Sequence, residues 1–178
     1  VATITKEDAL NDLALRGARY VLRRQNADGT WGYGAEDFQA RPDNFHTAFV
    51  LTSFARIMKT SSQARDELQA ATRRGYQKWA STFFLENGWP KYYTDSVYPA
   101  DAHSAGAAII AFSELRDLEP SAIEMAERVA LWAIRNLQDE SGFFYYQKRQ
   151  THTVRIPYMR WSQAWMHYAL STLLEVTA

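Results

Sequence analysis

Two histidines stand at matching places near the starts of two segments that carry almost no charge. His46 follows Asp43, and His103 follows Asp101. Arg160 takes the place of Asp101 at the start of a third segment of the same kind. Histidine transfers protons readily near neutral pH, and carboxylates act as acids, as bases or as partners of the imidazole ring. The sequence therefore predicts a polar site in which these five side chains carry catalysis.

The charged members of this set also have a structural interpretation, which stays open beside the catalytic one. Asp43 and Asp101 precede apolar segments, where aspartate is a favoured N-cap of a helix. Arg160 either forms an ion pair with one of these aspartates or binds the carboxylate of an acidic ligand such as a uronic acid. The residue types do not separate these alternatives.

We expect no metal and no other cofactor. The histidines do not form a close helical pair such as His-x-x-x-His, and His167 lies well inside an apolar segment, where we interpret it as a core residue. The chain also lacks a phosphate-binding glycine loop, a dinucleotide-binding glycine pattern, a nucleophile elbow and an EF-hand loop.

Aromatic residues make up 14% of the chain, and many fall in the long stretches that precede the apolar segments. Flat rings stack on the apolar faces of sugar rings, while a few placed polar groups bind the hydroxyls. We expect most of these rings to be structural, covering one end of the fold and filling the gaps between the loops. A smaller group is expected to bind substrate: Trp31, Trp89, Tyr93, Tyr158, Trp161 and Gln163.

The elements that must position these residues follow from hydrophobic periodicity. Three segments have one apolar and one charged face, as outer helices do, at residues 6–25, 62–85 and 121–138. Three others lack Lys, Arg, Asp and Glu and must be covered on all sides, at residues 45–55, 102–113 and 161–174. We therefore predict a single all-α domain over residues 1–178, with outer and inner helices in alternation.

Loop lengths place the two kinds of helix relative to each other. Long connections precede the inner helices, at residues 26–43, 86–101 and 139–158, whereas the returns at 59–62 and 116–120 are short. The long loops should therefore lie together above the N-terminal ends of the inner helices. Capping boxes are expected at Thr5 with Asp8 and at Ser121 with Glu124. No sheet is expected beyond local pairing around residues 143–147.

Composition limits the partners and the compartment. The chain has 20 basic and 20 acidic residues, which argues against nucleic-acid binding and against attraction to anionic membranes. It has no cysteine, no stretch suited to membrane insertion and no visible secretory signal. We expect a cytoplasmic protein with a small-molecule substrate.

A turn motif supports the helical expectation by resemblance. Gln25, Gly29 and Trp31 resemble the QW repeat of squalene–hopene cyclases and related terpene cyclases, and Gln138 with Gly142 keeps part of the spacing. The resemblance implies an α/α toroid in which the glutamine and tryptophan are structural. The acidic motifs that those cyclases use for catalysis are absent, which weakens cyclase chemistry and leaves an isoprenoid binder as one alternative.

A second resemblance covers about residues 10–176. The stretches 43–47, 99–105 and 156–165 look like bacterial proteins of the six-hairpin glycosidase-like superfamily that are associated with polysaccharide biosynthesis. Related families include unsaturated glucuronyl hydrolases and N-acylglucosamine 2-epimerases. The resemblance implies three α-hairpins, about half of a six-hairpin barrel. The other half would belong to a longer protein, come from a second copy, or have been lost.

Three functions are open at this point. The first is carbohydrate processing by a hydrolase, a lyase or an epimerase. Hydrolysis would use two carboxyl groups such as Asp43 and Asp101, with Glu36 and Asp37 as loop alternatives, whereas epimerisation would use the histidine pair. The second is a noncatalytic glycan-binding or interaction module. The third is the isoprenoid binder, which the polar starts of the inner segments disfavour.

Overall fold

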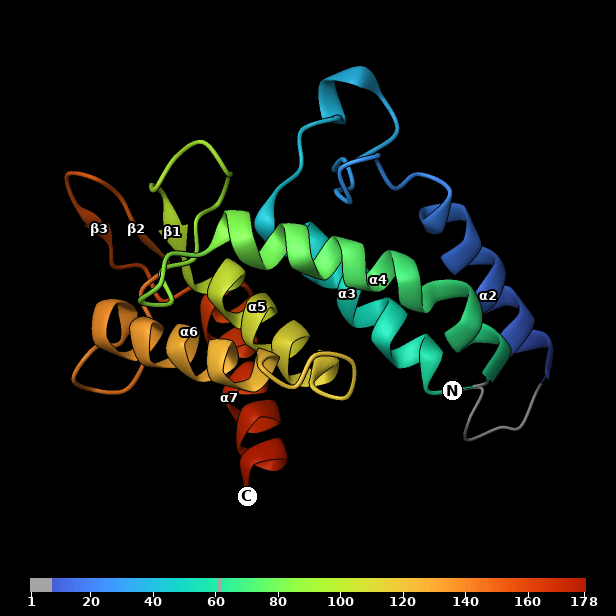
Figure 1. Cartoon of the computed structure of the whole chain (residues 1–178). Helices are drawn as coiled ribbons and strands as arrows, with labels where there is room; N and C mark the ends of the chain where they lie inside the picture. The colour runs from blue at the N-terminus through green and yellow to red at the C-terminus, as the bar shows by residue number, and fades with distance from the viewer. Residues whose placement is uncertain (1–7, 61) are drawn as a thin grey trace.

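Six helices form most of the protein in a computed structural model that describes residues 8–60 and 62–178 (Figure 1). Each of the six predicted helical segments is helical, so the mainly helical fold is confirmed. The helices are α2 (Asp8–Leu22), α3 (Asn44–Met58), α4 (Ser62–Phe83), α5 (Ala102–Leu115), α6 (Ala122–Leu137) and α7 (Ala164–Thr177). A 3₁₀ turn, η1 (Asp37–Gln39), lies in the loop that precedes α3.

Helices α3, α5 and α7 lie side by side, with α5 in the middle, while α4 packs on α3 and α6 packs on α5. The long loops gather at the end where α3 and α5 begin (Figure 1). We call this end the mouth: residues 23–43, 84–101 and 138–158 together with the first turns of α3, α5 and α7. Backbone bonds join the mouth together, because the Asn44 amide donates to Tyr92 and the Ala102 amide donates to Tyr146.

The helix starts confirm two sequence predictions and correct a third. Asp43 caps α3 and Asp101 caps α5, each through a carboxylate oxygen that accepts a backbone N–H three residues on. Ser121 has helical backbone angles and makes no side-chain capping bond, so the capping box with Glu124 is wrong. The predicted box at Thr5 lies outside the described residues.

A small antiparallel sheet forms at the mouth, where only local pairing was expected. Its strands are β1 (Ala100–Asp101), β2 (Gln147–Lys148) and β3 (Thr153–Val154), with β2 in the centre. Strands of two residues are too short to produce a visible alternation of apolar and polar positions. The sheet ties the loop before α7 to the start of α5, since Asp101 pairs with Gln147.

Helix α7 departs from the expectation that every charge-free segment is covered on all sides. It is entered through a π-helical turn, η2 (Met159–Gln163), and within α7 only Met166, Ala169 and Leu173 are fully buried. Helix α5, by contrast, is buried along almost its whole length. The difference arises because α5 has helices on both sides, whereas α7 has α5 on one side only.

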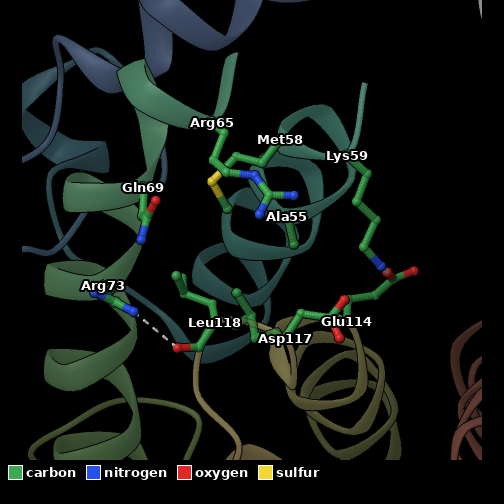
Figure 2. A pocket seen from close by; sticks show the side chains of 10 residues that line it. Ala55, Met58, Lys59, Arg65, Gln69, Arg73, Glu114, Asp117 and Leu118 are labelled. Carbon is green, nitrogen blue, oxygen red and sulfur yellow. Dashed lines mark hydrogen bonds and ion pairs between the residues drawn. The ribbon is translucent and has the colours of Figure 1, made fainter. Parts of the chain in front are cut away.

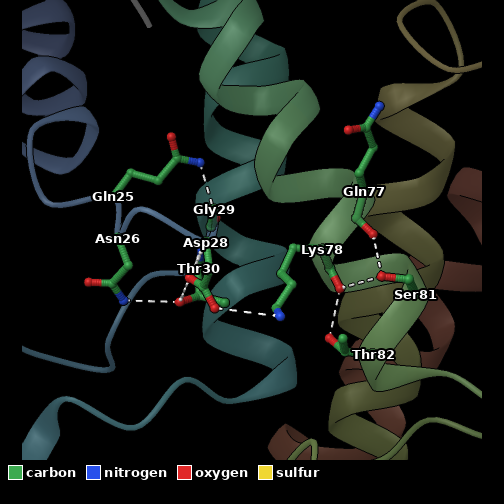
Figure 3. Close-up of polar contacts among 9 residues, drawn as sticks. All are labelled: Gln25, Asn26, Asp28, Gly29, Thr30, Gln77, Lys78, Ser81 and Thr82. Carbon is green, nitrogen blue, oxygen red and sulfur yellow. Dashed lines mark hydrogen bonds and ion pairs between the residues drawn. The ribbon is translucent and has the colours of Figure 1, made fainter.

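Three turns in which an aromatic residue closely follows a glycine, the Gly-aromatic turns, lie at Gly29, Gly88 and Gly142. The first of them fixes helix α2 to helix α4 (Figure 3). The Gln25 side chain donates to the carbonyls of Gly29 and Ala71, at 3.0 and 2.9 Å, and accepts from the Arg74 guanidinium at 2.8 Å. Asp28 in the same turn forms an ion pair with Lys78 of α4 at 3.6 Å. The turn is therefore a clasp between two helices, and Gln25 is its main polar contact.

Replacing Gln25 with Ala should reduce the free energy of unfolding by about 1–2 kcal/mol, because three hydrogen bonds are lost at a half-buried site. Gln138 is a matched control, since its amide makes one bond, to the Gly142 carbonyl at 3.1 Å. Gln138→Ala should cost about 0.5 kcal/mol. Urea denaturation of both variants measures the difference, and equal costs would show that Gln25 does not tie the two helices.

The part of the chain that the structure describes contains no helix long and apolar enough to cross a membrane.

Candidate functional site

Asp43 and His46 form a hydrogen-bonded pair at the start of α3. One oxygen of the Asp43 carboxylate accepts the His46 backbone N–H at 2.9 Å, and the other lies 2.7 Å from Nδ1 of the His46 ring. Asp43 is 5% exposed, whereas the His46 side chain is 35% exposed. The buried carboxylate therefore orients a ring that solvent and ligands can still reach. With Nδ1 as the donor to Asp43, Nε2 is left as the basic nitrogen.

His103 lies next to this pair and is surrounded by aromatic rings. Its ring is 4.6 Å from that of Phe45 and 4.8 Å from that of Trp165, between ring centres. Its Nε2 is buried and has no hydrogen-bond partner among the described residues. Burial, with a smaller contribution from the charge of His46, lowers the pKa of His103 to about 4, while Asp43 opposes this shift. His103 is therefore neutral at pH 7.

The two histidines are brought together through Phe45. The Phe45 ring is 4.0 Å from the His46 ring and 4.6 Å from the His103 ring, again between centres. Tyr33, from the loop before α3, contacts the other side of His46 at 4.5 Å. The result is an aromatic cluster that holds one accessible imidazole and one imidazole whose Nε2 is buried.

Asp101 is more deeply buried than Asp43 and has no histidine partner of its own. It is 2% exposed, and one carboxylate oxygen accepts the Ser104 backbone N–H at 2.7 Å. Burial raises the pKa of this carboxyl, and the Ser104 amide and the Gln147 side chain oppose the rise. Asp101 is therefore placed mainly as a helix cap.

A tyrosine-lined cleft of about 490 Å³ opens at the mouth. Its lining residues come from the two loops around the small sheet: Tyr92, Tyr93, Tyr98, Pro99, Tyr146, Gln147 and Arg149. The Tyr92 ring also contacts Phe45, with the ring centres 5.7 Å apart. Burial and the nearby carboxylates of Asp43 and Asp101 raise the pKa of the Tyr92 hydroxyl, so it stays protonated. Tyr92 thus lies between the cleft and Phe45, the ring that packs on both histidines, while the histidines themselves do not line the cleft.

The remaining predicted residues are spread over different surroundings. Arg160 is exposed, with its guanidinium carbon 5.6 Å from the centre of the Trp161 ring, and in the described part of the chain it forms no ion pair with either aspartate. Trp161 is 42% exposed and packs with Tyr158. Gln163 bonds the backbone of Phe144 in both directions, at 2.9 and 2.6 Å, and so connects a loop to the start of α7.

Two of the predicted substrate-binding tryptophans pack against helices instead. Trp31 is 5% exposed, its indole N–H donates to the Val21 carbonyl at 3.0 Å, and its ring covers Gly75 of α4. Trp89 packs against Trp132 of α6, with the ring centres 5.1 Å apart. Among the predicted ring residues, Tyr93 is the one that lines the tyrosine cleft, beside Arg41, whose guanidinium carbon is 3.7 Å from the centre of its ring.

Phe45, Tyr33 and Tyr92 were not singled out from the sequence as site residues. The position of Phe45 directly before His46 was the one available signal, because the equivalent residue before His103 is the small Ala102. A large ring opposite a small residue indicates that the ring extends across to the neighbouring helix. For Tyr33 and Tyr92, which come from long loops, no such local pattern exists.

The low pKa of His103 predicts a pH dependence of stability. Between the ordinary pKa of 6.5 and the folded value of about 4, the unfolded chain binds more protons at this residue than the native chain. Stability should therefore rise with pH across that window, by about 1–2 kcal/mol from this group after allowance for solvent screening of the half-buried ring. In His103→Phe the rise should be smaller, as urea denaturation between pH 4 and 7 measures. The interpretation of His167 as a core residue is wrong, because it is exposed on α7, and His167→Gln therefore serves as the control for replacing a surface histidine. An unchanged slope in His103→Phe would contradict a neutral ring with a buried Nε2.

A second, smaller cavity of about 100 Å³ lies at the end of the helices opposite to the mouth (Figure 2). Arg73 donates to the Leu118 carbonyl at 3.4 Å, and Lys59 is paired with Glu114 at 2.9 Å. These charges hold the short returns between helices in place, and the volume is small for a ligand. The mouth is therefore the better candidate for the functional site.

A cluster of metal ligands or a known relative would each indicate what the mouth does. Among residues 8–60 and 62–178, no three His, Asp or Glu side chains gather in a way that would hold a metal ion. No protein-family model matches the chain, and no curated protein matches it in sequence.

Proposed function

We propose that this chain is part of an α/α toroid that binds carbohydrate at its mouth and moves a proton on the bound sugar, as lyases and epimerases do. The observation that carries the proposal is the Asp43–His46 pair, with its 2.7 Å contact and a partly exposed ring, connected through Phe45 and Tyr92 to a cleft lined by tyrosines. A buried carboxylate that orients an accessible imidazole is a common arrangement for a general base. The alternation of outer and inner helices, with long loops at one end, supports the toroid.

Proton transfer is favoured over hydrolysis by the state of the two aspartates. A glycoside hydrolase needs two carboxyl groups that flank the scissile bond and are free to act. Asp43 and Asp101 are 5% and 2% exposed, and each uses one oxygen to cap a helix. The remaining oxygen of Asp43 is bound to His46. Of these two aspartates and the histidine that Asp43 binds, the side chain with reactive capacity left over is therefore the imidazole.

The neighbouring residues have defined roles in this proposal. His46 takes a proton from the sugar carbon at Nε2, and the Asp43 carboxylate stabilises the imidazolium that forms. The protonated Tyr92 hydroxyl is a donor for the developing oxyanion or the leaving oxygen. The rings of the tyrosine cleft stack on the sugar faces. His103 is neutral and keeps the surroundings of Phe45 apolar.

Solvent-deuterium exchange tests the proposal. Compounds that raise the melting temperature are first selected from uronic acids, hexosamines, neutral oligosaccharides and isoprenoid diphosphates. Each hit is then incubated with the protein in D₂O, and NMR follows loss of carbon-bound proton signals. Proton transfer predicts deuterium at a sugar carbon, or an unsaturated product, with wild-type protein and not with His46→Gln. His167→Gln is the matched control, since that histidine is exposed on α7.

Other results would replace the proposal. Hydrolysis products without carbon-bound deuterium would indicate glycosidase chemistry. Sugar binding without any turnover would indicate a glycan-binding module. A melting shift with isoprenoid diphosphates alone would favour the terpene-cyclase-like alternative.

A further inference from the structure

The first two Gly-aromatic turns are each pressed against the backbone of the following outer helix, whereas the third is not. A Cβ atom added at Gly29 would lie 2.8 Å from the Arg74 carbonyl oxygen of α4. A Cβ atom at Gly88 would lie 2.5 Å from the Arg128 carbonyl carbon of α6. A Cβ atom at Gly142 meets nothing within 4 Å. The third turn thus has the same left-handed glycine without the helix that covers the other two.

The side chains of helix α7 are likewise uncovered on the side where a further helix would pack. Met58, Leu115 and Leu174 hold equivalent places in α3, α5 and α7, ten residues after the alanines on which the three helices align. Met58 and Leu115 are 7% and 0% exposed, whereas Leu174 is 67% exposed. Leu131 of α6 is also exposed, at 49%. The edge formed by α6, α7 and the Gly142 turn is therefore apolar and uncovered.

The opposite edge of the chain carries the matching surface. Inside the chain, α3 packs on both α4 and α5, and α5 packs on both α6 and α7, so each inner helix contacts the next outer and the next inner helix. By the same rule, an inner helix that came before α3 in the ring would pack on both α2 and α3. An apolar groove of about 320 Å³ is found there, with Ala14, Gly17 and Val21 on the α2 side. Nothing lies within 4 Å of a Cβ atom at Gly17.

We propose that two copies of this chain join head to tail, with α7 of one copy in the α2–α3 groove of its partner. The partner's α2 then covers the Gly142 turn, as α4 covers Gly29 and α6 covers Gly88. A second copy is the occupant that the two edges favour, because the described residues carry an uncovered helix with its glycine turn on one edge and an apolar groove on the other. The closed dimer rests on the proposed toroid, since two such junctions give six hairpins and leave no free edge.

Sedimentation velocity over a concentration series tests the dimer. Wild-type protein should be dimeric, and two edge variants should each be monomeric. Leu174→Arg damages the α7 edge, and Gly17→Leu fills the groove edge. Neither should unfold the chain, because Leu174 is exposed and Gly17 is an open helical position where Leu has the higher helix propensity. Phe38→Arg, at a residue 84% exposed in the loop before α3, should remain dimeric.

Mixing the two edge variants distinguishes head-to-tail association from a symmetric contact of one face with itself. Leu174→Arg has an intact groove and Gly17→Leu has an intact α7, so the mixture should form a heterodimer through one good junction. Gly142→Ala should also abolish the dimer, because its Cβ would meet the docked helix. Monomeric wild-type protein, open-ended polymers, or a mixture that stays monomeric would each overturn the proposal. Because the readout needs no ligand, these outcomes are independent of the proposed sugar chemistry.

Discussion

Replacing Asp43 with Asn is expected to reduce turnover of the proposed sugar substrate by roughly 10³- to 10⁴-fold while the protein stays folded. The fold persists because asparagine is as good an N-cap as aspartate, and its carbonyl oxygen can still accept the His46 backbone N–H. The second contact changes in kind. An amide NH₂ opposite Nδ1 makes Nδ1 the acceptor, so the proton of the neutral ring moves to Nε2 and the base is lost.

Asp101→Asn is the matched control for this experiment. Asp101 caps α5 in the same manner as Asp43 caps α3, and it is also buried, slightly more deeply than Asp43. It lacks the bond to a histidine ring, so its substitution should change turnover less than about tenfold. If Asp101→Asn were as inactive as Asp43→Asn, two carboxyl groups would be required and hydrolysis would become the better proposal.

The tautomer of His46 provides a readout that needs no substrate. Long-range ¹H–¹⁵N correlation spectra report which ring nitrogen carries the proton. Wild-type protein should show the Nδ1–H form of His46, and Asp43→Asn should show the Nε2–H form. A wild-type spectrum with the proton on Nε2 would contradict the proposed orientation of the base.

Sequence patterns could predict the elements and the two aspartate caps, because these depend on neighbours along the chain. The striped and charge-free segments become helices, and Asp43 and Asp101 are recognisable as caps from the apolar runs that follow them. The juxtaposition of His46 and His103 follows from equal positions on adjacent helices that pack side by side. Local periodicity combined with loop length is enough for these features.

Contacts between distant segments could not be predicted in the same way. The direction of Trp31 depends on Gly75, which leaves space for the indole on a different helix. The surroundings of Arg160 depend on the π-helical turn, which no simple residue pattern specifies. The exposure of α7 depends on which helices flank it, and a charge-free segment carries no information about that. Arg160 and the tryptophans therefore needed three-dimensional structure to be placed.

The largest effect on stability is expected for Gly88→Ala. Gly88 has a φ of +83°, which costs an alanine about 1–2 kcal/mol. The added Cβ would also lie 2.5 Å from the Arg128 carbonyl carbon and 2.8 Å from the Val129 nitrogen. These are backbone atoms of a packed helix and cannot rotate away, so overpacking adds about 1–3 kcal/mol. The free energy of unfolding should therefore fall by about 2–5 kcal/mol in total.

Gly142→Ala separates the two contributions, because Gly142 has a φ of +98° and open space around the added Cβ. It should cost about 1–2 kcal/mol, the backbone penalty alone. Both variants are best compared in the monomeric Leu174→Arg background by urea denaturation, so that association does not enter the measurement. The difference between them is then the cost of pressing a methyl group into the α6 backbone. Equal losses would mean that the Gly88 turn does not pack against α6 in solution. The Gly88 turn would then no longer support the inferred packing of a partner helix on the Gly142 turn.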